Sequence, residues 1–277
     1  MVNVSVVVPC FNQGRFLDEA VQSVLAQTYQ DFEIVIVNDG STDGQTTSML
    51  RSYVQPRTRV LHTDNQGLAS ARNNGIRAAT GRYILPLDAD DRIADSYLGK
   101  AVALLDANPN AGIVYSQAEY FGERTGRWEL PDYNFPRILL ENMIFASSLF
   151  RKADWEEVHG YNPNMKHGLE DYDFWLSLIE LGRDVIQIPE PLFLYRQTSE
   201  SMRNAITREQ LISLSTQLFR NHLGLYEKNI NVVVEHLFDL RTWHFQLREQ
   251  VRHLEERIRG LENGEPGGPV LSAGDTV

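Results

Sequence analysis

The sequence predicts an α/β fold, with a mostly parallel central sheet flanked by helices and a C-terminal helical extension. Apolar runs at residues 4–8, 33–37, 59–62 and 83–87 have the length and composition of buried strands. Stretches of helical periodicity separate these runs, and this alternation is typical of parallel strands joined by crossover helices. With 277 residues, 42% of them hydrophobic, the chain can bury a substantial core.

Each predicted strand is followed by a stretch in which apolar residues recur at helical spacing. These stretches are residues 16–25, 41–53, 68–79 and 96–106. A further strand is expected at residues 112–116. Regular structure then resumes at residues 144–150, with helices expected at residues 153–158, 172–181 and 207–223. Between them, residues 119–142 combine weak periodicity with glycines, prolines and aromatic residues, which predicts a long loop.

The pattern changes after the α/β part, so we expect a domain over residues 1–205, a helical extension over 206–262 and a disordered tail over 263–277. Within the extension, apolar residues and one histidine recur at alternating steps of four and three. They are Leu240, His244, Leu247, Val251, Leu254, Ile258 and Leu261. Charges of both signs flank this heptad seam. It indicates either a homo-oligomer that forms through residues 237–261 or one amphipathic helix packed on its own domain.

The overall charge and the cysteine content exclude several classes of protein. A formal net charge of −11 without a Lys/Arg-rich run argues against nucleic acid as a partner. The single cysteine, Cys10, allows no internal disulfide and fits a reducing compartment. No signal peptide and no apolar run of ~18 residues is visible, so we expect no membrane span. The expected location is cytoplasmic, at most peripheral to the inner face of the plasma membrane.

The most informative stretch is ILPLDADD at residues 84–91, where an apolar strand ends in three carboxylates. Asp88, Asp90 and Asp91 lie within four residues and repel one another unless a cation is present. Oxygen ligands suit hard divalent cations, so this strand end predicts a site for Mn²⁺ or Mg²⁺. The alternative is an acidic turn that caps the next helix.

Two other strand ends carry side chains that could bind a nucleotide. The sequence PCFN follows the first strand, and NDGSTD follows the second. Asp39 could accept a hydrogen bond from a nucleobase N–H, and Phe11 could pack against a base. Taken alone, the turn that contains Asp39 is equally a helix cap.

The segment NQGLASARNNG at residues 65–75 begins a predicted helix. Gly67 frees the backbone there, and the guanidinium of Arg72 could hold diphosphate oxygens. The usual dinucleotide and P-loop glycine motifs are missing.

A second acidic pair stands in HGLEDYDFW at residues 167–175. Glu170 and Asp171 precede a predicted helix and could cap it. Together with a metal-type cluster earlier in the chain, however, a second carboxylate could serve as general base for an acceptor hydroxyl.

Taken in order, these motifs resemble those of the inverting family 2 glycosyltransferases of the GT-A fold, over roughly residues 3–200. The resemblance includes VVVPCFN, VNDGSTD, NQG with ARN, LDADD, and ED with Trp175, and it ends at Tyr195 and Arg196. It implies that a nucleoside-diphosphate sugar binds at Pro9, Phe11, Asn12, Asp39, Gly67, Arg72, Asp88 and Ala89.

The resemblance also implies a role for individual residues. Asp39 would bind the base, Arg72 would lie near the diphosphate or the base, and Asp88 would hold the ribose. Asp90 would ligate Mn²⁺ or Mg²⁺. Asp171 would be the catalytic base, with Glu170 supporting it, and Trp175 would pack beneath the site. Thr198 stands where relatives often carry a histidine, which leaves metal dependence open.

The expected activity is transfer of a sugar, with inversion, from a nucleoside-diphosphate sugar to an acceptor hydroxyl in glycan or surface polysaccharide biosynthesis. UDP is the nucleotide that the resemblance implies, and the acceptor is a glycan, a lipid-linked glycan or a protein. One alternative is a nucleotidyltransferase that forms nucleotide sugars, although residues 13–15 give little of the glycine-rich basic loop it needs. Another is a non-catalytic scaffold that acts through the C-terminal helix.

Overall fold

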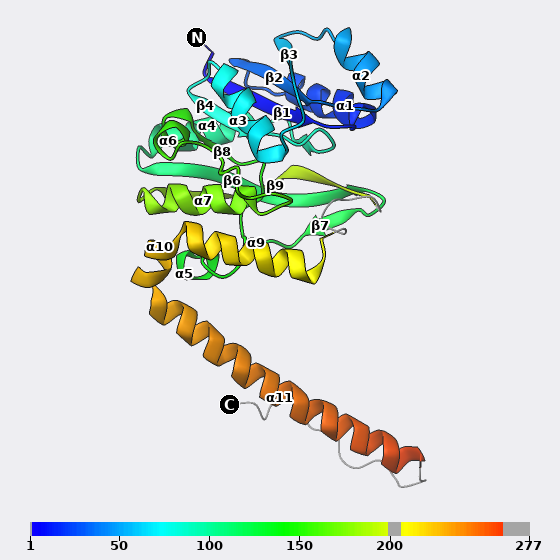
Figure 1. Ribbon diagram of the computed structural model, residues 1–277, viewed down its shortest axis with the longest axis vertical. Coiled ribbons are helices and arrows are strands. Elements are labelled where there is room, and N and C mark those ends of the chain that lie inside the picture. Colours follow the sequence, from blue (N-terminus) through cyan, green and yellow to red (C-terminus); the bar gives the residue numbers. More distant parts are fainter. Residues whose placement is uncertain (1, 199–205, 263–277) are drawn as a thin grey trace. The chain divides into compact units, whose positions relative to one another are not determined.

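The computed structural model describes residues 2–198 and 206–262 of the chain (Figure 1). The chain divides into two compact units, Met1–Tyr226 and Glu227–Val277. The first unit contains the sheet and the helices packed on it. It also takes in residues 206–226, the first part of the predicted helical extension, while the predicted tail lies outside the described residues.

The first part of the chain alternates strands and helices as predicted. Its elements are β1 (Val4–Cys10), α1 (Gly14–Leu25), β2 (Phe32–Asp39), α2 (Gly44–Arg51), β3 (Thr58–Thr63), α3 (Leu68–Ala78) and β4 (Tyr83–Pro86). The strands β1 and β4 are buried along their whole length, which is why they appear in the sequence as continuous apolar runs.

The second part is less regular. Its elements up to the sixth helix are β5 (Arg92–Ile93), α4 (Tyr97–Ala107), β6 (Ala111–Gly122), β7 (Gly126–Trp128), α5 (Phe135–Ile138), β8 (Leu149–Arg151) and α6 (Lys152–Glu157). They are followed by α7 (Glu170–Glu180), β9 (Asp184–Gln197), α9 (Arg208–Asn221), α10 (Leu223–Lys228) and α11 (Ile230–Glu262).

Among the described residues, nine strands form one mixed sheet in the order β3-β2-β1-β4-β8-β6-β9-β5, with β7 paired to β6. The pairs among β1, β2, β3 and β4 are parallel, and so is the pair β6 and β9. The strand β8 joins the two halves through antiparallel pairs with β4 and β6. The predicted α/β class is confirmed, with antiparallel strands added in the second half.

The prediction of a long loop over residues 119–142 was partly wrong. The strand β6 continues to Gly122, and β7 runs antiparallel beside it. Pairing with β7 and β9 stabilises this end of β6, although its sequence lacks the alternating apolar pattern that is typical of a strand. No strand was predicted where β9 lies.

Helices cover both faces of the sheet. The helix α3 lies against β1 and β2, and it approaches closely because Gly75 has no side chain: a Cβ there would stand 2.3 Å from Cγ1 of Val7. The helix α7 packs near β6, and α9 runs beside α7 on the side away from the sheet (Figure 1). The helices α3 and α7, which carry predicted site residues, contact each other through Arg72 and Glu170.

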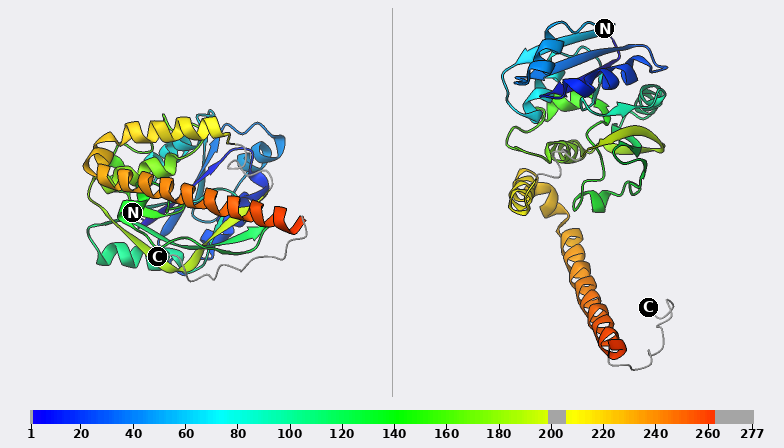
Figure 2. Two further views of the ribbon diagram at one scale, coloured as in Figure 1. Left: turned by 90° about the horizontal axis from the view of Figure 1, so that it is seen from below. Right: turned by 90° about the vertical axis from the view of Figure 1, so that its right-hand side faces the viewer.

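The second unit is dominated by α11, a single continuous helix of 33 residues (Figure 2). Within residues 2–198 and 206–262, no helix is both long and apolar enough to span a bilayer.

Candidate active site

The carboxyl ends of β1, β2 and β4 share one edge of the sheet, and Asn12 ties two of the loops that leave it. Its Oδ1 accepts hydrogen bonds from the backbone N–H groups of Thr42 (2.8 Å) and Asp43 (3.1 Å). Asn12 has a left-handed backbone with φ of 55°. Of the other residues predicted to border a nucleotide, Pro9 is buried in β1, whereas Phe11 is 43% exposed.

Asp39 is buried at the end of β2 and holds the loop that leads into α3. Its Oδ1 accepts from the backbone N–H of Gln66 (3.0 Å) and its Oδ2 from that of Gly67 (2.9 Å). Gly67 has φ of 85°, a conformation that costs glycine little, and it is the residue directly before α3. Asp39 therefore fixes the start of α3, and its contact with a base stays a prediction.

The three carboxylates after β4 occupy different environments. The side chain of Asp88 is 32% exposed, that of Asp91 is buried, and Ala89 between them is fully buried. Asp90 is half-buried, and burial together with the charge of Asp88 raises the pKa of its carboxyl to about 6. The cluster predicted from sequence is therefore a turn with one buried and two partly accessible carboxylates.

Arg196, at the end of β9, fixes this turn. Its backbone N–H donates to Oδ1 of Asp91 (2.8 Å), and its Nε donates to the backbone carbonyl of Asp90 (2.8 Å). Its guanidinium also lies 4.5 Å from the ring of Phe16 and 4.3 Å from that of Phe121. The end of β9 therefore contacts the carboxylate of Asp91 and the backbone of Asp90 directly, whereas the sequence connected it with these motifs only through the family resemblance.

The second acidic pair stands at the start of α7, after three residues with positive φ. They are His167 (76°), Gly168 (140°) and Leu169 (60°). Non-glycine residues adopt this region at a cost, and such strain concentrates at functional sites. After this turn, the side chain of Glu170 lies inside the protein and is 8% exposed, whereas Asp171 is half-buried.

Asp171 accepts two hydrogen bonds and has a raised proton affinity. Its Oδ1 accepts from the backbone N–H of Tyr172 (2.7 Å), and its Oδ2 accepts from Nδ2 of Asn142 (3.4 Å). Burial, followed by the charge of Glu170, raises the pKa of the Asp171 carboxyl above its usual range. A carboxylate with raised proton affinity is suited to act as a general base near neutral pH.

Arg72 connects the two acidic clusters. Its Nη1 donates to Oε1 of Glu170 (2.6 Å), and its Nη2 donates to Oδ1 of Asp88 (2.8 Å). The side chain is only 1% exposed, so its two terminal nitrogens are engaged inside the protein. Residues that lie 82 positions apart in the sequence therefore share one guanidinium. The predicted contact of Arg72 with a diphosphate or base stays a prediction.

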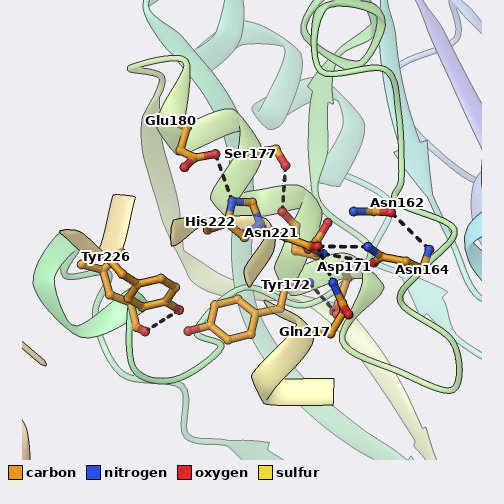
Figure 3. Close-up of polar contacts among 12 residues, drawn as sticks. Asn162, Asn164, Asp171, Tyr172, Ser177, Glu180, Gln217, Asn221, His222 and Tyr226 are labelled. Atoms are coloured by element: carbon orange, nitrogen blue, oxygen red, sulfur yellow. Dashed lines mark hydrogen bonds and ion pairs between the residues drawn. The ribbon is translucent and has the colours of Figure 1, made fainter. Parts of the chain in front are cut away.

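The helix α7 is anchored on two sides. Beneath it, Trp175 is fully buried and its ring centroid lies 5.9 Å from that of Phe150, as predicted for a packing residue. On the other side, His222 of the segment after α9 places Nδ1 3.0 Å from Glu180 and Nε2 3.3 Å from Asp173 (Figure 3). Burial opposes the charged imidazole, but these carboxylates outweigh it and raise the pKa of His222 to about 9.

Further hydrogen bonds attach the same helix to its surroundings. Asn221 donates to Oδ1 of Asp173 (Figure 3). The hydroxyl of Tyr172 donates to the carbonyl of Ile138. Sequence reasoning missed Asn142 and His222. No local motif marks either residue, because each acts on α7 from a distant part of the chain.

The turn after β4 offers some of the ligands that a divalent cation needs. Asp88 and Asp90 offer carboxylate oxygens within one turn, which is the donor type that Mn²⁺ and Mg²⁺ prefer. In the described part of the chain, no group of three or more His, Cys, Asp or Glu side chains could hold a metal ion. The residues therefore fit a cation that takes most of its ligands from water or a bound phosphate, as Mg²⁺ commonly does.

Comparison with solved structures identifies the fold. S. aureus TarS in complex with UDP-GlcNAc matches with a TM-score of 0.66 and 19% identity, over 79% of this chain and 66% of that chain. The mannosyltransferase PcManGT from Pyrobaculum calidifontis, in complex with GDP-Man and Mn²⁺, matches with a TM-score of 0.63 and 23% identity, over 80% of this chain and 64% of the other. At these identities the likeness shows the fold alone, which is the GT-A fold.

Comparison of the sequence identifies the family. The glycosyltransferase GlyG of Streptococcus pneumoniae is 32% identical over 220 residues, which cover 72% of each chain. Two other relatives, 33% and 32% identical, are much longer, and the match spans 23% and 32% of their lengths. The model of glycosyl transferase family 2 matches residues 5–165, more than half of the sequence. The chain therefore belongs to glycosyl transferase family 2.

Proposed function

We propose that this protein transfers a sugar from a nucleoside-diphosphate sugar to a hydroxyl group of a glycan acceptor, with inversion of configuration, in polysaccharide biosynthesis. The observation that carries the proposal is the shared guanidinium of Arg72, which holds the start of α7 against the turn after β4. A donor placed at that turn would have its sugar near Asp171. The nucleotides bound by TarS and PcManGT support a UDP- or GDP-sugar as donor, and UDP is the one we propose.

In the proposed reaction, Asp171 accepts the proton of the acceptor hydroxyl as its oxygen attacks the anomeric carbon. The attack comes from the face opposite the departing nucleoside diphosphate, which inverts the configuration. Asn142 orients Asp171 through its side-chain amide, while Glu170 raises the proton affinity of Asp171 and is itself neutralised by Arg72. A positioned general base typically accelerates such a step by ~10²- to 10⁴-fold.

Asp90 is the residue that we propose to hold Mn²⁺ or Mg²⁺, with Asp88 beside it. A divalent cation, when bound, would neutralise the charge that develops on the leaving diphosphate. Asp88 is already oriented by Arg72, and Arg196 fixes the backbone of Asp90. The turn is therefore rigid before any ligand binds, which lowers the entropic cost of binding.

The test is a panel of UDP- and GDP-sugars, with and without Mn²⁺, measured by thermal stabilisation and by release of the nucleoside diphosphate. A donor at 100 times its Kd should stabilise the protein by about 2.7 kcal/mol. In Asp90→Ala the Mn²⁺-dependent part of this stabilisation should be lost. Asp95→Ala removes an exposed carboxylate nearby in the sequence and should behave as wild type. If no nucleotide sugar binds the wild-type protein under either condition, the proposal is wrong.

A further inference from the structure

The helix α11 carries an unusual amount of exposed apolar surface. Among the described residues, 19 large apolar side chains are exposed, and 11 of them belong to α11. Leu237 is 60% exposed, Leu254 and Ile258 are 54% exposed each, and Trp243 is 61% exposed. Apolar surface on this scale normally marks an interaction site.

The exposed residues include a continuous stripe with heptad spacing. Leu237, Val251 and Ile258 occupy one position of the heptad, position a, together with His244. Leucines at residues 240, 247 and 254 occupy position d, and each is between 42% and 54% exposed. Residues at a and d of a helix face one partner helix, because the repeat of 3.5 residues keeps them on one side. The stripe extends over three heptads.

The composition of the stripe indicates what covers it. Two of the a positions are β-branched and all three d positions are leucine, which is the arrangement that favours two parallel helices. In a parallel pair of identical helices in register, each layer packs against its own copy, so β-branched residues meet β-branched residues and leucines meet leucines. His244 is a polar residue at a, and a single polar layer of this kind fixes the register.

The charges on α11 are consistent with a protein partner and disfavour an anionic membrane. Residues 230–259 contain five arginines and five acidic residues, whereas helices that lie on membranes are rich in cations on their polar face. In a parallel pair, Gln250 of one helix faces Glu255 of the other, and Trp243 faces Arg248. Neither contact brings like charges together, and an arginine beside a tryptophan ring is favourable.

We propose that two copies of this chain associate through α11 as a parallel, in-register, two-stranded coiled coil along the stripe from Leu237 to Ile258. The association needs no donor, metal or acceptor, so it can be tested independently of the proposed sugar transfer.

The first experiment measures the mass of the full chain by light scattering and by sedimentation at several concentrations. The wild-type protein should have twice the chain mass of 31.6 kDa. The variant with Leu247→Glu and Val251→Glu places charges in the stripe and should raise the dissociation constant by at least about 100-fold. The control with Thr242→Glu and Gln246→Glu adds the same charges on the opposite face and should stay dimeric. Circular dichroism and the midpoint of urea unfolding establish that each variant is folded.

The second experiment determines the orientation of the helices. Cys10 is buried and is the sole cysteine of the sequence, so one introduced cysteine can report on the pairing. The variant Leu240→Cys should form a disulfide-linked dimer under mild oxidation, because residue 240 of a parallel pair meets itself. In an antiparallel pair it would face the other end of the stripe, about 27 Å away for 18 residues of helix.

Four results would overturn the proposal. The first is a wild-type protein that stays monomeric up to 100 µM. The second is cross-linking of a mixture of the Leu240→Cys and Ile258→Cys proteins without self-linking of either, since this would show an antiparallel pair. The third is a monomer that binds vesicles containing phosphatidylserine through α11, which would assign the apolar face to a membrane. Loss of the dimer in the Thr242→Glu, Gln246→Glu control would equally remove the stripe as the interface.

Discussion

The turn after β4 and the start of α7 each hold an inner carboxylate fixed inside the protein and an outer one that is accessible. In the turn, Asp91 is buried against the backbone N–H of Arg196, and Asp90 is the outer group. In the helix, Glu170 is buried against Arg72, and Asp171 is the outer group. In both places, burial and a neighbouring carboxylate raise the pKa of the outer group.

The two clusters differ in how their outer group is oriented. The backbone of Asp90 is fixed by Arg196, and the side chain lies in a turn with a second carboxylate, Asp88, two residues away. Two adjacent oxygen donors suit a cation. The carboxylate of Asp171 is instead held by Asn142 and by the backbone N–H of Tyr172, at the start of a helix. One oriented carboxylate with raised proton affinity suits proton transfer. The two proposed roles therefore differ in what stands beside the outer carboxylate, which is a second accessible carboxylate at Asp90 and an orienting amide at Asp171.

The largest effect that separates the clusters is expected from Asp171→Asn. Turnover should fall by ~10²- to 10⁴-fold, because the amide cannot accept the proton of the acceptor hydroxyl. The donor Kd should stay within about twofold of wild type, since the turn after β4 is unchanged. Steady-state kinetics and calorimetry with Mn²⁺ and the donor measure the two quantities. Full turnover in this variant would remove Asp171 from the proposed role.

The second prediction concerns the guanidinium that the clusters share. Arg72→Met leaves Glu170 buried without its partner and should lower the free energy of unfolding by about 3–5 kcal/mol. Adding Glu170→Gln should restore part of this loss, because the amide needs no counter-charge. Urea unfolding of both single variants and of the double variant gives the coupling energy. Additive losses would mean that Arg72 and Glu170 stabilise the protein independently.

The third prediction concerns His222, which follows α9 and contacts α7 at Asp173 and Glu180. The folded-state pKa of His222 is raised to about 9, above the ordinary value of about 6.5. The stabilising charge is therefore fully present below pH 6.5 and is lost as the pH rises through 9. The wild-type free energy of unfolding should fall over this window, by about 1–3 kcal/mol. In His222→Gln this part of the fall should be absent. An unchanged slope in the variant would assign the pH dependence to other groups.

The sequence predicted the first half of the fold well, because β1, β2 and β4 are buried and leave continuous apolar runs. It did not predict β9, which contains Pro189 and Pro191, residues that usually exclude a strand. The structure accommodates them through a register shift: Ser116 pairs with Ile188, but the next residue, Gln117, pairs with Pro191. Such a bulge depends on the partner strand and has no local signal.

Among the candidate site residues, the sequence identified the acidic motifs but not the contacts that distinguish them. The side chain of Asp91 looks equivalent to that of Asp90 in the sequence, yet it is buried against β9. Arg72 appeared as a possible ligand for phosphate because it follows a helix start. Its actual partners, Asp88 and Glu170, come from other elements, and only the folded chain brings them to one guanidinium.

The smallest effect is expected from Glu170→Gln, which tests whether the charge of Glu170 raises the pKa of Asp171. If Asp171 is the base, it must be ionised, so the rate should rise with pH through its pKa. Glu170 raises that pKa by its charge, whereas Arg72 lowers it. Removing the charge of Glu170 should therefore move the acidic limb of the kcat profile to lower pH, by about one pH unit, while burial keeps it above that of an ordinary aspartate. Asp90→Asn offers the contrast, because it should weaken Mn²⁺-dependent donor binding without moving this limb. If the acidic limb of the kcat profile does not move in Glu170→Gln, the pH dependence of the rate does not reflect the ionisation of Asp171. The two clusters would then share their arrangement of inner and outer carboxylates but not a functional use of the raised pKa.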